Sequence, residues 1–107
     1  MTGFVQLIEY RTSRPDEIAA LMADYRGKRE AEAADGPSPT RVMVCSDRDE
    51  SGRYTSIVEF ASYEEAMENS NRPDTSEFSS ALMELCDGPP TFHNLDLLEV
   101  EEFQRKS

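Results

Sequence analysis

The sequence has no tryptophan, one histidine and two cysteines, and these scarcities exclude several kinds of site. Cys45 and Cys86 lie far apart in the chain and form no CxxC pair. With His93 as the sole histidine, cysteine and histidine cannot supply a standard zinc site. We therefore expect two free thiols in a reducing cytoplasm, and no metal or other cofactor. No motif supports a catalytic Cys–His pair.

Long apolar runs and basic residues are also scarce. No stretch approaches the ~20 apolar residues that cross a bilayer, and the first residues lack the pattern of a secretory signal. Eleven Lys and Arg stand against 22 Asp and Glu, for a formal net charge of −11. Nucleic acid and anionic lipid would repel such a chain, so we expect neither as a partner and place the protein in the cytoplasm. We expect a single domain over residues 1–107, with a charged tail from about residue 101.

The apolar patterning predicts four strands and two helical regions. The strands are expected at residues 4–10, 41–46, 53–60 and 91–100. Apolar residues at helical spacing predict one helix from Pro15 to about Ala34, and a second region in two parts introduced by Ser62 and by Pro73. The order βαββαβ predicts a ferredoxin-like α+β fold, with the helices on one face of a four-stranded antiparallel sheet.

The strands are apolar on both sides, although the helices suffice to cover only one face of the sheet. In the first strand Gln6 and Ile8 share one face, while Val5 and Leu7 lie on the other. A small protein rarely leaves a large apolar sheet face in water. We therefore expect a symmetric homodimer in which two copies bury these faces against each other, as a dimeric α+β barrel.

Two segments resemble the antibiotic biosynthesis monooxygenase-like family of dimeric α+β barrels. They are the strand-to-helix junction at 60–66, FASYEEA, and the PPTF run at 89–92 before the last strand. With the element order, the resemblance covers roughly residues 4 to 103. It implies a ligand pocket within each protomer, between helices and sheet. Cofactor-free oxygenases of the family hold an aromatic, acidic substrate with Trp, Tyr, Asn and Arg side chains.

The resemblance does not extend to the haem-degrading branch of the family. That branch carries asparagine, tryptophan and histidine at positions that align with Ile8, Asn69 and Leu82. None of the three residue types is retained there, so the resemblance does not imply haem.

The expected pocket lies between the strand face that bears Gln6 and Ile8 and the helical stripes that bear Tyr25, Asn69 and Phe78. We expect these five residues to contact an aromatic small molecule. Buried amides need hydrogen-bond partners, which a ligand would supply to Gln6 and Asn69. The alternatives are a neighbouring strand as the partner of Gln6, and a helix-end role for Asn69.

His93 and Asn69 are the candidate catalytic residues. The unperturbed pKa of histidine lies near neutrality, which suits His93 to general acid or base catalysis. The alternative is a structural role within its strand. The loop at 47–52, DRDESG, resembles the start of a calcium loop, but its twelfth position is Val58 where glutamate is required. We interpret it as a hairpin loop.

Three functions remain open. The first is a cofactor-independent monooxygenase that stabilises the anion of an aromatic or polyketide-like molecule, which then reacts directly with molecular oxygen. The second is a non-catalytic small-ligand-binding or stress-related barrel protein. The third is an interaction module whose acidic surface meets a basic partner. An open cavity between helices and sheet favours the first two functions, and a filled core favours the third.

Overall fold

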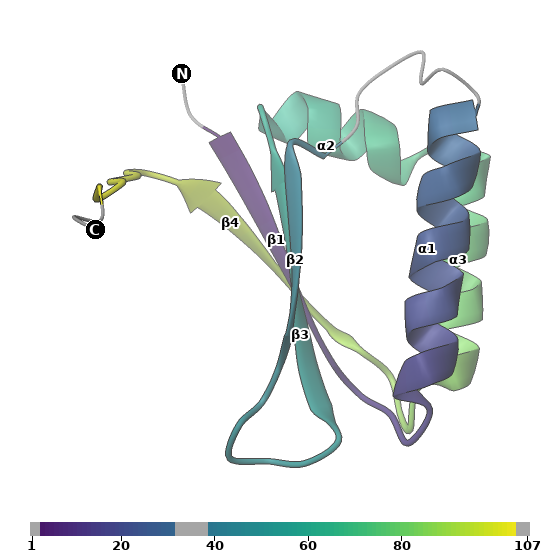
Figure 1. The fold of residues 1–107 in the computed structure, drawn as a ribbon. Coiled ribbons are helices and arrows are strands. Elements are labelled where there is room, and N and C mark those ends of the chain that lie inside the picture. Colours follow the sequence, from purple (N-terminus) through teal and green to yellow (C-terminus); the bar gives the residue numbers. More distant parts are fainter. Residues whose placement is uncertain (1–2, 32–38, 105–107) are drawn as a thin grey trace.

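The structure is a computed structural model that describes residues 3–31 and 39–104. Within these ranges the helices and strands follow the predicted order. They are β1 (Gly3–Arg11), α1 (Pro15–Ala31), β2 (Arg41–Ser46), β3 (Arg53–Phe60), α2 (Tyr63–Ser70), α3 (Pro73–Leu85) and β4 (Thr91–Leu97). The helices all lie on one side of the sheet (Figure 1).

The four strands form an antiparallel sheet in the order β2-β3-β1-β4, with β1 and β3 in the centre. Phe4 is paired with Phe60, and Tyr10 with Tyr54, along the β1–β3 ladder. Side chains alternate between the two faces, so residues 4, 6, 8 and 10 of β1 face the helices. The predicted ferredoxin-like α+β fold is confirmed. We call the face under the helices the inner face and the opposite one the outer face.

The outer face carries apolar side chains, and no helix that the structure describes lies over them (Figure 1). Leu7 is paired with Ile57 of β3, and Val5 with Leu95 of β4. Leu95 keeps 43% of its surface exposed, whereas inner-face Phe4 keeps 3%. The strands are apolar on both faces, and in the isolated chain one of these two faces is therefore open to solvent.

The last strand is shorter than predicted. β4 ends at Leu97 instead of Val100, because Leu97 is paired with Gly3, the first residue of β1. Beyond Leu97, the described part of β1 offers no backbone groups for further pairing. The predicted end of the first helix near Ala34 lies outside the described residues.

The inner face holds two core clusters at opposite ends of the sheet. Phe4, Phe60 and Ala66 meet beneath α2. Tyr10, Ile18 and Leu82 meet where α1 and α3 approach the sheet. The two longer helices also pack against each other, since the ring of Tyr25 stacks on Phe78 at 4.6 Å.

Thr12 ties together the turn that follows β1. Its hydroxyl donates to the Leu85 carbonyl at 2.7 Å and accepts from the Arg14 N–H at 2.9 Å. Its own N–H donates to the Gly52 carbonyl at 3.0 Å. One buried side chain thus joins the β1–α1 turn to the end of α3, and its backbone joins that turn to the β2–β3 hairpin.

The start of α2 offers a test of the capping predicted from the sequence. The Ser62 hydroxyl accepts the Glu65 N–H at 3.2 Å. Replacing Ser62 with alanine removes this bond and should lower the free energy of unfolding by about 1 kcal/mol. Chemical denaturation measures the change. The control is Ser80→Ala at an exposed position inside α3, which should cost nothing measurable. Equal values for the two variants would contradict the capping role.

Candidate functional site: a groove between the sheet and α1

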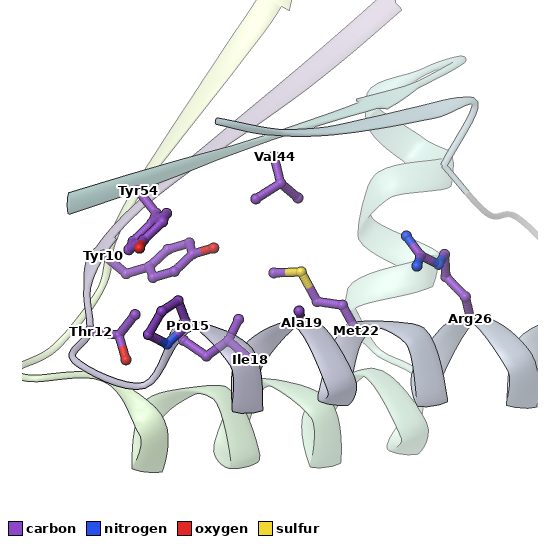
Figure 2. A pocket seen from close by; sticks show the side chains of 9 residues that line it. All are labelled: Tyr10, Thr12, Pro15, Ile18, Ala19, Met22, Arg26, Val44 and Tyr54. Carbon is purple, nitrogen blue, oxygen red and sulfur yellow. The ribbon is translucent and has the colours of Figure 1, made fainter. Parts of the chain in front are cut away.

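An open groove of about 280 Å³ runs between the inner face of the sheet and α1 (Figure 2). Its walls are mostly apolar. α1 contributes one wall, and Val44 of β2 lies opposite. The apolar side chains from α1 are Pro15, Ile18, Ala19 and Met22. Such a concave, apolar space with a few polar groups is the usual form of a small-molecule site.

Two phenols form one end of the groove. Tyr10 and Tyr54 are register partners in β1 and β3, and their rings stack at 5.8 Å with an angle of 18° between their planes. Tyr10 is buried, and its hydroxyl points into the space between Val44 and Met22 (Figure 2). Burial raises the pKa of Tyr10, the Ser56 hydroxyl lowers it, and Cys86 and Tyr54 raise it further. The phenol of Tyr10 is therefore a neutral hydrogen-bond donor at pH 7.

Ser56 lies beside these phenols on the inner face. It is 4% exposed, and its backbone is paired with Ile8 of β1 and Val44 of β2. Its hydroxyl lowers the pKa of the Tyr10 phenol, but the two groups do not have the geometry of a full hydrogen bond. Among the described residues, the Ser56 hydroxyl has no other hydrogen-bond partner. A buried hydroxyl without a full hydrogen bond costs free energy, which a polar ligand atom or a water molecule would offset.

Arg26 lies at the other end of the groove (Figure 2). It is exposed and forms no ion pair with any side chain that the structure describes. Most of the arginine side chains that the structure describes do have a carboxylate partner, as Arg41 has in Glu59. The groove thus offers an apolar slot with phenol donors at one end and an exposed cation at the other, an arrangement suited to a flat molecule with an acidic group.

None of the five residues predicted to bind a ligand lines this groove. Ile8 and Phe78 pack against the cluster around Tyr10 and Leu82. Tyr25 stacks on Phe78 and shares a hydrogen bond of 3.0 Å with the Thr75 hydroxyl. Side chains thus pack in much of the space in which we expected a ligand, and the groove lies nearer to β2.

The two residues whose amides we expected to bind a ligand both take part in hydrogen bonds within the protein, Gln6 through its side chain and Asn69 through its backbone. Gln6 donates from Nε2 to Oδ1 of Asn94 on β4 at 3.1 Å, which matches the alternative of a neighbouring-strand partner. Asn69 is buried in the last turn of α2, and its backbone carbonyl accepts the Arg72 N–H at 3.2 Å. A ligand-binding role for either amide stays a prediction.

His93 lies on the outer face, paired in register with Leu7. Its Nε2 is 3.5 Å from Oε2 of Glu9, which also lies 3.6 Å from Arg53. Asn69 is on α2, on the other side of the sheet, so the structure does not bring the two predicted catalytic residues together (Figure 1). A catalytic role for each stays a prediction, and a shared site for both is excluded in a single copy.

The sequence carries a signal for the position of the two phenols. Tyr10 alternates with Ile8 onto the inner face, and the hairpin pairing then brings Tyr54 beside it. Arg26 had no such signal, because its position follows the end of the apolar stripe of α1.

Within residues 3–31 and 39–104, no group of three or more His, Cys, Asp and Glu side chains is placed to hold a metal ion. In the same part of the chain, no helix combines the length and the apolar character needed to cross a membrane.

Comparisons with known proteins show the fold through structure alone, because no protein-family model and no curated protein matches the sequence. A proposed antibiotic biosynthesis monooxygenase from Bordetella bronchiseptica aligns with a TM-score of 0.72 at 18% identity, over 94% of this chain and 100% of that one. A counterpart from Caulobacter crescentus gives 0.70 at 18% identity, over 92% and 90%.

SnoaB, a cofactor-independent oxygenase from Streptomyces nogalater, was solved as a point mutant and aligns with a TM-score of 0.66. Identity is 13%, and the alignment covers 97% of this chain and 98% of SnoaB. This chain therefore has the fold of the antibiotic biosynthesis monooxygenase-like proteins, as the sequence motifs predicted.

The burial of Tyr10 makes stability depend on pH in a defined direction. The raised pKa means that the folded protein holds this proton more tightly than the unfolded chain does. The resulting stabilisation is complete below the ordinary tyrosine pKa of about 10 and is lost as the pH rises through the raised value. Tyr10→Phe should make the fall in unfolding free energy above pH ~10 less steep. Denaturation at a series of pH values tests this.

The matched control for that series is Tyr63→Phe, since the Tyr63 ring is 52% exposed. This variant should keep the wild-type fall. If Tyr10→Phe and the wild type lose the same unfolding free energy between neutral and alkaline pH, the prediction that Tyr10 is buried as a neutral phenol is wrong.

Proposed function

We propose that the groove binds an acidic hydroxyaromatic or polyketide-like molecule and that the protein acts on it as a cofactor-independent monooxygenase. The observation that carries this proposal is the pair of stacked phenols, Tyr10 and Tyr54, at one end of an apolar groove whose other end holds Arg26. The same fold in SnoaB, a cofactor-independent oxygenase, supports the choice of reaction.

The groove would favour the anionic form of its ligand. The apolar walls exclude water from the ring system, which strengthens electrostatic interactions inside. A hydroxyl of Tyr10 or Tyr54 donates a hydrogen bond to a ligand oxygen that carries negative charge, and Arg26 supplies positive charge at the opposite end. Donors fixed by the packing of β1 and β3 need little reorganisation to do this.

The chemistry that such an anion undergoes with oxygen balances without a cofactor. A ring CH₂ next to a carbonyl loses a proton, and the resulting anion transfers an electron pair to O₂ as a C–O bond forms. The peroxide takes up a proton and then loses water, so that CH₂ plus O₂ becomes C=O plus H₂O. The protein's part is to bind the molecule, hold its anion and exclude competing solvent.

One observation favours a second candidate, a binding protein without catalysis. Among the described residues that line the groove, none is a histidine, an aspartate or a glutamate. Proton removal would then depend on the acidity of the ligand itself or on water. A ligand that is not acidic enough would be bound and released unchanged.

Ligand binding is tested with a dihydroxyanthrone under nitrogen, by calorimetry on the wild type and on Tyr10→Phe. Loss of one hydrogen bond to a charged oxygen should weaken binding roughly tenfold, while Tyr63→Phe should bind as the wild type does. Admitting oxygen then separates the two candidates. Protein-accelerated formation of the anthraquinone supports the monooxygenase, and tight binding without acceleration supports the binding protein.

The same assay covers the residues predicted from the sequence. If Asn69→Leu or Gln6→Leu weakens binding of the dihydroxyanthrone while Tyr10→Phe binds it as the wild type does, the site lies in the space between Ile8 and Phe78 instead of in the groove. A loss of turnover in His93→Gln would support its predicted catalytic role. No binding by any dihydroxyanthrone or dihydroxynaphthalene would contradict both candidate functions.

We also propose that the outer sheet face forms a homodimer. Analytical ultracentrifugation should give twice the chain mass of 12.1 kDa. Leu95→Arg places a charge on that face and should shift the protein to monomers with little change in fold. The control is Met83→Arg on α3, similarly exposed but on the helical side, which should stay dimeric. A monomeric wild type at micromolar concentration would overturn this part of the proposal.

A further inference from the structure

The Ser56 hydroxyl is an exception to the way in which this protein treats its buried polar groups. Among the buried side-chain nitrogen and oxygen atoms of residues 3–31 and 39–104, it alone lacks a full hydrogen bond. Thr12, equally buried, forms two such bonds through its hydroxyl. Buried polar groups are almost always hydrogen-bonded, because the loss of water is otherwise uncompensated. The free energy that Ser56 costs therefore needs a physical explanation.

The surroundings of Ser56 on the inner face leave it few partners. Its cross-strand partners and its neighbours two positions away on β3 are Ile8, Val44, Tyr54 and Val58. Among the diagonal neighbours, Ser46 on β2 is exposed, and Gln6 on β1 donates to a side chain of β4. The remaining diagonal neighbour on β1 is Tyr10, and this is the residue whose phenol the Ser56 hydroxyl influences.

The Tyr10 phenol extends toward the row of the sheet that contains Ser56. Its hydroxyl points into the space between Val44 and Met22 (Figure 2), and Val44 is the register partner of Ser56. Tyr10 lines the groove, whereas Ser56 is not among the described residues that line it. Ser56 therefore lies beside the phenol but outside the groove, so its influence on a ligand passes through Tyr10.

The direction of the interaction follows from its effect on the Tyr10 proton. Burial raises the pKa of Tyr10 most, the Ser56 hydroxyl lowers it, and Cys86 and Tyr54 raise it further. A hydrogen bond lowers the pKa of a phenol when it is donated to the phenol oxygen, since the donor stabilises the negative charge there. A bond donated by the phenol would have the opposite effect. Ser56 is therefore the donor, and the Tyr10 oxygen is the acceptor.

Donation by Ser56 determines where the Tyr10 proton is directed. A phenol has a single proton, and here that proton is not used on Ser56. A ligand oxygen that carries negative charge accepts the proton in a strong hydrogen bond. The phenol oxygen then becomes a better acceptor, because hydrogen bonds in a chain polarise one another. Binding of such a ligand thus completes the bond that Ser56 lacks.

We propose that Ser56 is a positioning residue, whose hydroxyl donates to the Tyr10 oxygen and commits the Tyr10 proton to an ionised oxygen of the ligand. The ligand part of this inference rests on the proposed function, whereas the pairing of Ser56 with Tyr10 does not. The pair makes the groove select an ionised hydroxyaromatic molecule over one whose oxygen is methylated. The unsatisfied hydroxyl lowers the stability of the protein for the sake of this selectivity.

Calorimetry with the ionised dihydroxyanthrone under nitrogen tests the effect on the ligand. Ser56→Ala should weaken binding roughly fivefold, because a hydrogen bond completed in the complex is lost. Binding of the O-methylated anthrone should be the same in this variant and in the wild type. The matched control is Ser46→Ala, which removes an exposed hydroxyl beside Tyr54 and should bind as the wild type does. Unchanged binding of the ionised ligand by Ser56→Ala would overturn the positioning role.

A double variant separates action through Tyr10 from direct contact with the ligand. In the Tyr10→Phe background no phenol oxygen remains to accept from Ser56. Adding Ser56→Ala to this background should therefore leave binding unchanged, so the two effects are not additive. A further fivefold loss in that background would mean that Ser56 contacts the ligand itself, and the proposal would then be wrong.

A measurement without ligand tests the pairing independently of the proposed function. Removing the Ser56 donor should raise the pKa of Tyr10 further, so that the folded protein keeps this proton to a higher pH. The stabilisation, complete below the ordinary tyrosine pKa of about 10, is then lost over a wider range as the pH rises. Ser56→Ala should accordingly lose more unfolding free energy than the wild type between neutral and alkaline pH.

This excess loss should vanish when Tyr10→Phe is also present. At neutral pH, Ser56→Ala should be at least as stable as the wild type, since it removes an unsatisfied buried group, and this shows that the variant is folded. No excess loss in Ser56→Ala would overturn the pairing. If the excess appears but the wild type does not bind the dihydroxyanthrone, the pairing stands and the proposed function fails.

Discussion

The period-two alternation of β1 governs most of the architecture. β1 lies in the sheet between β3 and β4, so each of its side chains faces either the helices or the outer face. Its even-numbered residues supply Phe4 and Tyr10 to the two core clusters, and one of these, Tyr10, also forms the end of the groove. Its odd-numbered residues place Leu7 and Glu9 on the outer face, where Glu9 meets His93. A shift of register by one residue would exchange the two sets and remove both the core and the site.

The sequence was sufficient for the fold because local and long-range signals agreed. Alternation identified the strands, and the Ser62 cap and Pro73 marked the two parts of the second helical region. The error at the end of β4 has a physical cause. The residues after Leu97 have strand character, but a strand also needs a neighbour, and the length of β1 sets how far that neighbour extends. Propensity alone carries no information about the partner.

The site was only partly accessible from the sequence. Placing it between helices and sheet follows from the fold, whereas the choice of residues depends on how closely each helix packs. The rings of Tyr25 on α1 and Phe78 on α3 stack on each other, so they fill part of the space in which we expected a ligand. The gap lies instead between α1 and β2, where small Ala19 faces Val44. Periodicity identifies which side of a helix is apolar, but not whether that side is filled, since filling depends on the sizes of side chains from three elements.

The pairing of β1 with β4 has a consequence for how the chain folds. Gly3 meets Leu97, so β1, which is synthesised before the other strands of this sheet, completes its pairing only after β4 has been synthesised. β1 can pair earlier with β3, but one of its edges stays unsatisfied until β4 emerges. Contacts this distant in sequence slow folding, and an apolar strand exposed in the interval is prone to association. The nascent chain therefore passes through a stage in which one edge of β1 is unpaired and open to association.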